Sequence, residues 1–335
     1  MRRAHAKAGP SSPWRRPVAA ALSLAALAGA GDARAQRAPN LPPQPGAAIS
    51  APTPAPPTHR LLFRSTTLAR YNPLGLFGEA RFGYRRRLFE SESALLRDTF
   101  AGVGLAGTLS PAITSISPSL EFQPLSVFQL TASYSASLFF GGFGHLQSYP
   151  SAASPHSDDD RDAGEEAGRA YRTTRGQFTV QPLVQVKVGP VAARSATRFI
   201  YNLSDLRRGD RVSYDPVADL LVPRDGWVIA NDSDLVAVTP FGLTAGLRYS
   251  MARAIYDDDD FAPGEDPRSP ASRTIQRIGP LVSYTFFDRP GAGFNTPTVF
   301  VLAQWWLDHH YRAGQDSSQA VPYLIVGFSF SGDLL

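Results

Sequence analysis

SVFQLTASYSASLFFG, residues 126–141, guides the interpretation of the whole chain, because its side chains separate into two faces. The even positions are apolar: Phe128, Leu130, Ala132, Tyr134, Ala136, Leu138 and Phe140. The odd positions carry amides and hydroxyls: Gln129, Thr131, Ser133, Ser135 and Ser137. Side chains of an extended chain point alternately to two sides, so this pattern predicts a β-strand with one apolar and one polar face.

The length of this stretch indicates what covers the apolar face. Strands of soluble proteins usually run about 5–6 residues, whereas a tilted strand that crosses a bilayer needs about 9–11. Residues 173–188 repeat the pattern at similar length, with Val184 on the apolar face and Lys187 on the polar one. We therefore predict the wall of a membrane β-barrel, apolar towards lipid and polar towards the interior.

The same alternation recurs along residues 60–335 without a domain break. We count twelve wall strands, four before Pro124 and eight after it, within a range of 10–14. Residues 227–238 alternate poorly, and residues 217–222 read as a short extra strand above the membrane. The predicted fold is a single closed antiparallel transmembrane β-barrel of the all-β class.

Composition narrows the possible functions. The first 36 residues hold six basic side chains and one acid, which leaves 27 basic and 28 acidic residues in the remainder, so a nucleic-acid partner is not expected. The chain has no cysteine, which excludes disulfides, thiolate metal sites and a Cys nucleophile. No metal site and no cofactor are predicted.

The N-terminal region reads as an export signal followed by a tether. Residues 1–36 combine a basic start, an apolar run and Ala33-Arg34-Ala35 as a cleavage site, with cleavage after Ala35 or Gln36. Arg15-Arg16 leaves a twin-arginine signal as the alternative. Residues 37–59 are rich in proline and are expected to be a disordered linker, with a partner-binding polyproline motif as the alternative.

Long polar loops alternate with short turns. The loops fall at residues 142–172, 204–226, 257–272 and 313–319, and the turns at 124–125, 189–190, 239–240 and 288–296. The loops at 142–172 and 257–272 are acidic, which favours solvated charge over calcium binding, because the spacing matches no EF-hand loop. An even number of strands places both termini on the periplasmic side, with the long loops outside.

These features resemble those of Gram-negative outer-membrane β-barrel proteins as a class: a cleavable signal, amphipathic strands, long outer loops and an aromatic last strand, YLIVGFSFS at 323–331. The resemblance covers about residues 60–335 and matches no individual family. It implies outer-membrane lipid as surroundings and the barrel-assembly machinery as a partner during biogenesis. Such proteins often end on Phe, whereas here Phe328 and Phe330 are followed by five more residues.

Two sets of residues follow from the predicted faces. The lipid-facing set is Phe128, Tyr134, Leu138, Phe140, Val184, Trp305 and Tyr311. The pore-lining set is Arg64, Arg81, Arg85, Lys187, Arg194, Arg198, Arg248 and Arg312, with few acids opposite. Basic rings favour anions, so we expect a pore or surface barrel open to small solutes. The alternative is that these arginines pair with acids or with an inserted loop and close the lumen.

Three other readings stay open. An outer-membrane hydrolase would use Asp308 and His310, which alternation places together on the inner face while His309 points to lipid. No nucleophile accompanies them in the sequence. A structural or adhesive surface protein would act through the acidic loops, and a secreted β-sandwich would bury the apolar face under a second sheet.

Overall fold

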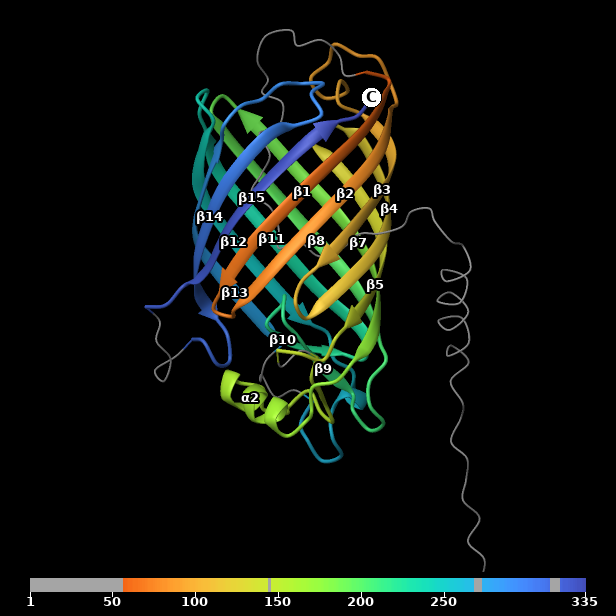
Figure 1. The fold of residues 1–335 in the computed structure, drawn as a ribbon, viewed down its shortest axis with the longest axis vertical. Coiled ribbons are helices and arrows are strands. Elements are labelled where there is room, and N and C mark those ends of the chain that lie inside the picture. The colour runs from red at the N-terminus through yellow and green to blue at the C-terminus, as the bar shows by residue number, and fades with distance from the viewer. Residues whose placement is uncertain (1–56, 144–145, 268–272, 314–319) are drawn as a thin grey trace, which may run out of the picture. The chain divides into compact units, whose positions relative to one another are not determined.

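Twelve antiparallel strands close into a barrel in the computed structural model, which describes residues 57–143, 146–267, 273–313 and 320–335 (Figure 1). The strands of the barrel are β1 (His59–Tyr71), β2 (Gly75–Arg87), β3 (Phe100–Leu109), β4 (Ile113–Leu125), β5 (Phe128–Phe139), β7 (Thr173–Val188), β8 (Val191–Ser204), β11 (Asp225–Val238), β12 (Leu243–Ala254), β13 (Thr274–Thr285), β14 (Asn295–Asp308) and β15 (Tyr323–Asp333). Pairing of β1 with β15 closes the wall. The fold prediction and the count of twelve are confirmed. The predicted signal and the tether up to residue 56 lie outside the described residues.

The two faces of the wall differ as the alternation predicts. On β5, Ser133, Ser135 and Ser137 are buried inside the barrel, whereas Tyr134 is exposed on the outside. Large apolar side chains are exposed around the outer surface: Phe82, Val103, Leu120, Phe178, Leu235, Leu247, Val282, Val301 and Val326. A belt of this kind is the surface that a bilayer covers. No helix in the described part of the chain is long and apolar enough to cross a membrane.

The two ends of the barrel are unequal. At one end lie residues 57 and 335 and the connections 88–99, 126–127, 189–190, 239–242 and 286–294. At the other end, the lower one in Figure 1, lie the long connections 140–172, 205–224 and 255–273. The strand predicted at 217–222 is found here as β10 (Leu220–Pro223), which pairs with β9 (Val212–Asp215) and, through it, with β6 (Ser148–Tyr149).

A short helix that the sequence did not predict also lies at this end. α2 (Asp158–Glu166) begins at Ser157, whose hydroxyl accepts a hydrogen bond from the backbone N–H of Asp160 while the Asp160 carboxylate accepts from the Ser157 N–H. This reciprocal capping, with acids in the first turn, stabilises the positive end of the helix dipole. The acidic run at 158–160 is therefore partly a helix start and not only solvated charge.

Candidate functional site

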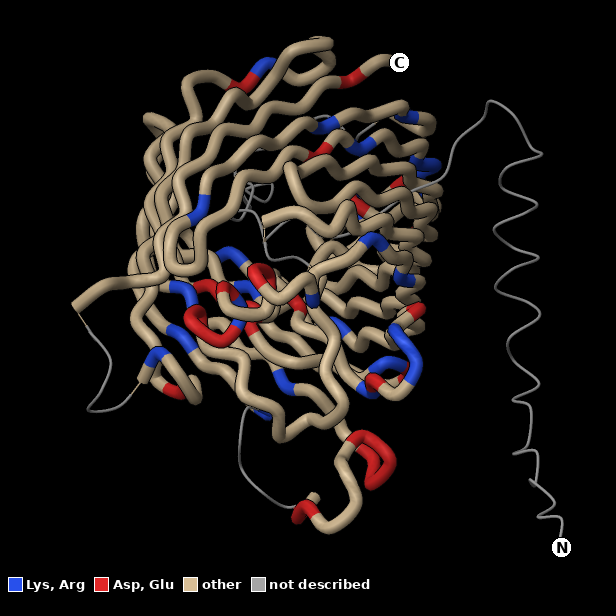
Figure 2. The backbone as a smooth tube through the Cα atoms, turned by 60° about the horizontal axis from the view of Figure 1, so that its bottom comes forward, with Lys and Arg blue, Asp and Glu red and all other residues tan. Residues whose placement is uncertain are grey.

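The end with the long loops is closed by folded polypeptide, which we call the cap: β6, α2, β9, β10 and residues 309–313. Figure 2, turned towards this end, shows acidic and basic positions crowded across the mouth. Leu220 and Val222 of β10 pack inside the barrel against Ile200, Val228 and Ile275 of the wall. Burial of these apolar side chains seats the β9–β10 hairpin in the mouth.

Polar contacts tie the same hairpin to other parts of the wall. Arg175 of β7 donates to the Asp215 carboxylate at 2.7 Å and to the Ser213 hydroxyl at 2.7 Å, and the side chains of Arg175 and Asp215 are each 1% exposed. On β1, Arg70 donates to the carbonyl oxygen of Pro216 at 2.6 Å. Since β1 and β7 lie on nearly opposite sides of the barrel, the hairpin spans the mouth.

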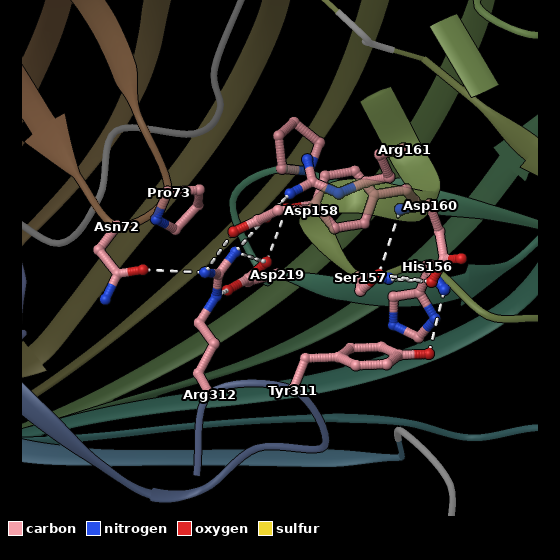
Figure 3. A network of polar contacts seen from close by, with 12 residues as sticks. Asn72, Pro73, His156, Ser157, Asp158, Asp160, Arg161, Asp219, Tyr311 and Arg312 are labelled. Carbon is pink, nitrogen blue, oxygen red and sulfur yellow. Dashed lines mark hydrogen bonds and ion pairs between the residues drawn. The ribbon is translucent and has the colours of Figure 1, made fainter. Parts of the chain in front are cut away.

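A third set of contacts centres on Asp219, in the turn between β9 and β10 (Figure 3). Its carboxylate accepts from Arg312 Nε at 2.6 Å and from the Tyr214 hydroxyl at 2.6 Å, and it lies 3.2 Å from His309 Nε2. Burial opposes ionisation of Asp219, but the hydrogen bond from His309 and the charge of Arg312 hold its pKa well below the ordinary value. The carboxylate therefore stays charged, and the cap keeps its ion pair at neutral pH.

Arg312 extends the network to two further segments. Its guanidinium donates to both carboxylate oxygens of Asp158 in α2, at 2.8 and 2.9 Å, and to Asn72 Oδ1 at 2.8 Å. Asn72 lies in the β1–β2 turn, so one side chain joins the helix, the β9–β10 turn and the barrel rim. Arg312 was predicted to line the pore, and it lies instead beyond β14, in the cap.

The predicted catalytic pair is not assembled. Asp308 and His310 are both exposed, and in the described ranges no hydrogen bond joins them, whereas His309 is buried at 5% exposure. The cause is a bulge: Arg277 pairs with Trp306 and Gln276 with Asp308, which leaves Leu307 as an extra residue and inverts the alternation after it. The prediction that His309 faces lipid is corrected by this irregularity, which no simple alternation reveals.

His309 has a geometry that suits structure rather than proton transfer. Nδ1 accepts from the backbone N–H groups of Tyr311 at 3.0 Å and Arg312 at 3.1 Å. Nε2 lies 3.1 Å from the Asp219 carbonyl oxygen, so both ring nitrogens are engaged. A general base needs a free lone pair directed at a reacting proton, which this ring lacks. Among the described residues no cluster suited to a metal ion is present either.

Two ion-paired groups of arginines line the middle of the lumen. On β8 and β12, Arg194 donates to Asp234 at 2.9 Å and Arg248 makes two bonds to the same carboxylate, at 2.6 and 2.8 Å. Arg198 donates to Asp232 at 3.1 Å. In the second group, Arg85 donates to Glu121 at 3.0 Å, and Arg81 lies 3.8 Å from both Glu79 and Glu121. Arg64 lies opposite Arg81 in the pairing of β1 with β2.

Sequence reasoning missed Asp232 and Asp234 as partners of the lumen arginines. Asp232 and Asp234 lie on β11, whose alternation is blurred because Val228, Ala230 and Val236 also face inward. Counting outward from the residues that flank the turn at 239–242 would place Asp234 opposite Leu247. In the structure the pairing begins one residue later, at Val238 with Thr244, and therefore places Asp234 opposite Arg248. The interior is also less polar than predicted, since Leu68, Leu281, Phe300, Leu302 and Ile325 form an apolar cluster on its inner surface.

The remaining lumen forms a cavity of about 1160 Å³ at the end that carries the termini, which we call the vestibule. Lys187 lines it, and its inner limit is formed by Arg85, Arg194 and Asp234.

Of the residues predicted to face lipid, Tyr134, Phe140, Val184 and Trp305 are exposed on the outer face, and Phe128 and Leu138 are partly exposed there. Tyr311 lies instead in the cap, where its hydroxyl accepts from the backbone N–H of His156 at 3.0 Å.

Comparisons with known proteins identify no family: no protein-family model and no curated sequence matches. Similar solved structures include the NanC porin, at 8% identity and TM-score 0.37, covering 82% of this chain and 100% of that one. The translocator domain of the autotransporter NalP from Neisseria meningitidis has 11% identity and TM-score 0.34, over 82% and 87% of the two chains. LpxR from Salmonella typhimurium has 5% identity and TM-score 0.36, over 81% and 99%.

These TM-scores lie below 0.5, so the class assignment rests on the geometry of this chain. A closed antiparallel barrel, an exposed apolar belt, membrane-length strands and loops concentrated at one end are together the features of a transmembrane barrel. The chain thus has the architecture of Gram-negative outer-membrane β-barrels as a class.

Proposed function

We propose that this protein is a gated outer-membrane channel that admits small anionic solutes from one side into an arginine-lined lumen and is closed on the other side by its cap. The observation that carries the proposal is the pairing of an open vestibule with a cap whose charged contacts, in addition to its apolar packing, gather around Asp219 and Arg312.

The charge of the lumen supports anions as the solute class. The wall presents more basic than acidic side chains, and each carboxylate of the two lumen groups, Glu79, Glu121, Asp232 and Asp234, already accepts hydrogen bonds from an arginine or lies within 4 Å of one. Residual positive charge in a low-dielectric pore attracts anions and repels cations. The long strands and the apolar belt fit insertion by the barrel-assembly machinery, with export directed by residues 1–36 and both ends of the chain in the periplasm.

The test is conductance of the purified full chain in planar bilayers under a KCl gradient. Wild type is expected to stay mostly closed, whereas Arg312→Gln, which loses the contacts with Asp219 and Asp158, is expected to conduct with a reversal potential of anion-selective sign. Arg253→Gln, at an exposed position outside the cap, serves as the matched control. A folded Arg312→Gln variant that does not conduct, or that favours cations, would overturn the proposal.

A further inference from the structure

A second, much smaller cavity of about 60 Å³ lies inside the barrel between the wall and the cap. Its wall side is formed by residues of β8, β11, β12, β13, β14 and β15, among them Arg198, Arg248 and Arg277. Val217 and Ala218, in the turn between β9 and β10, line it from the cap side. The cavity therefore exists only while the cap is seated.

Arg277 contributes an unusual guanidinium to this cavity. The residue is 8% exposed, and its Nε and Nη1 atoms are buried without a hydrogen-bond partner. Within the described part of the chain the guanidinium meets aromatic rings: its carbon lies 3.8 Å from the ring centroid of Tyr323 and 4.9 Å from that of Trp306. Ring faces stabilise a cation partly, but they do not accept its N–H groups, and a buried charge without a counter-charge is costly.

The other charges around the cavity are already matched. Arg248 is held by both oxygens of Asp234, and Arg198 by Asp232. Asp232 also accepts from the Ser250 hydroxyl at 2.5 Å, so it is engaged on both oxygens. Within the described residues, no carboxylate lies within ion-pair distance of Arg277, whereas Arg198 and Arg248, the other arginines that line the cavity, each have one.

A second buried hydrogen-bond donor, close to Arg277, also lacks an acceptor. Trp306 Nε1 is buried and has no hydrogen-bond partner. The indole ring lies between Arg277 and His309, with 4.6 Å between the centroids of the Trp306 and His309 rings. Trp306 does not line the cavity, but Arg277 does, and a cavity-lining guanidinium without a carboxylate partner is complementary to a ligand that is negative and accepts hydrogen bonds.

We propose that the cavity at Arg277 binds one small monovalent anion, of the size of a halide. Water needs about 10–15 Å³ of such space for one molecule, so the cavity holds a ligand of a few atoms and excludes sugars, nucleotides and lipid headgroups. A bound anion would neutralise the Arg277 guanidinium. A water molecule could fill the same site but would leave that charge unbalanced.

The position of the site links the anion to the cap. Because Val217 and Ala218 form one side of the cavity, an anion bound there favours the seated cap over a displaced one by mass action. The use of this site by a permeating anion rests on the proposed channel function, but binding itself does not. Binding is therefore measured on the closed protein in detergent, where conductance plays no part.

Tryptophan fluorescence provides the measurement, because bromide quenches an indole at short range and the Trp306 ring centroid lies 4.9 Å from the Arg277 guanidinium carbon. The chain has four tryptophans, and replacing Trp14, Trp227 and Trp305 by Phe in the full chain leaves Trp306 as the sole reporter. Titration with bromide at constant ionic strength, balanced with a large organic anion, is expected to quench this reporter with saturation. Chloride is expected to compete, which separates bound ion from collisional quenching.

Two variants decide the assignment. Arg277→Gln is expected to abolish saturation and leave weak linear quenching, and Arg277→Lys, which keeps the charge, is expected to bind at least tenfold more weakly. Arg253→Gln is the control and should titrate as the parent does. Retention of the folded barrel is checked by the mobility shift on heating before electrophoresis. Linear quenching in the parent protein, or saturation that survives in folded Arg277→Gln, would overturn the proposal.

Discussion

His156 places a titratable ring inside the cap. It is 4% exposed, its Nδ1 lies 3.1 Å from the Ser154 carbonyl oxygen, and its ring meets the Tyr311 ring edge-on with 4.9 Å between centroids. Burial lowers the pKa of His156 to about 4, with His309 and His310 adding to the shift, against the opposing effects of Ser154 and Asp219. The seated cap thus holds the neutral imidazole, and a displaced cap lets it take up a proton.

Acid is therefore expected to loosen the cap. Above pH 6.5, the ordinary pKa, the two states bind the same number of protons; as the pH falls from 6.5 towards 4, the displaced state binds one more, and the seated state loses up to about 3 kcal/mol. The protection factors of residues 212–223, which correct for the slower intrinsic exchange at low pH, should fall over this window in wild type. In His156→Phe, which keeps the aromatic contact, the fall should be absent; an equal fall in that variant would contradict the role of this ring.

Arg175 and Asp215 form the most deeply buried ion pair between wall and cap. Asp215 Oδ1 also accepts from the backbone N–H groups of Val217 and Ala218, both at 2.9 Å, so the same carboxylate shapes the turn above the small cavity. Loss of one partner strands the other charge, which costs about 3–5 kcal/mol in buried pairs.

Arg175→Met is expected to destabilise the seated cap by that amount, while leaving the barrel folded, because the β7 backbone pairing does not depend on the side chain. Protease sensitivity of the 205–224 segment reports on the cap, and the heat-induced mobility shift reports on the barrel. The double variant Arg175→Met with Asp215→Asn should recover part of the loss, since no stranded charge remains. A double variant less stable than the single one would show that the pair contributes mainly through something other than charge.

At the level of the elements, the bulge in β14 determines which side chains reach the cap. With Leu307 as the extra residue, Trp306 and His309 both face inward, three positions apart. A bulge of this kind cannot be found by following alternation. The side chains after it still alternate between the two faces, but each points to the face opposite to the one that simple counting predicts.

Deletion of Leu307 is therefore expected to be tolerated, since it restores one-to-one pairing and leaves His309 directed inward. Deletion of Ala303, in the regular part of the same strand, shifts every later residue to the opposite face and should prevent a folded barrel. Folding yield and the mobility shift measure both variants. If the two deletions were equally harmful, the extra residue would have a role beyond setting the register.

How far the sequence carries depends on the element. β5 and β7 keep a largely polar inner and an apolar outer face, and alternation predicts them well. Alternation predicts β11 poorly, because the inner face of this strand mixes Asp232 and Asp234 with Val228 and Val236. The cap could not be predicted from the sequence for another reason. Its contacts join residues far apart in the chain, such as Arg312 and Asp158, which are 154 positions apart, and they lie in loops whose side chains follow no alternating pattern.

At the level of the whole molecule, the asymmetry of the two ends predicts a direction across the membrane. The barrel has an even number of strands, so the start of β1 and the end of β15 lie side by side, as the pairing of Leu62 with Asp333 shows. The cap, the helix α2 and the long loops lie at the opposite end. Loops of that length are typical of the cell-surface side of such barrels, and the short turns of the periplasmic side.

Single cysteines test this orientation, because the chain has none of its own. Glu166 in α2 and Arg289 in the connection at residues 286–294 are both exposed, and they lie at opposite ends of the barrel. In intact cells that express the full chain, a membrane-impermeant maleimide should label Glu166→Cys, because the outer membrane shields only the periplasmic end. Arg289→Cys should be labelled only after the outer membrane is permeabilised. The reverse pattern would place the cap and its acid-sensitive His156 in the periplasm and turn the vestibule towards the medium, so that solutes would enter the arginine-lined lumen from outside the cell.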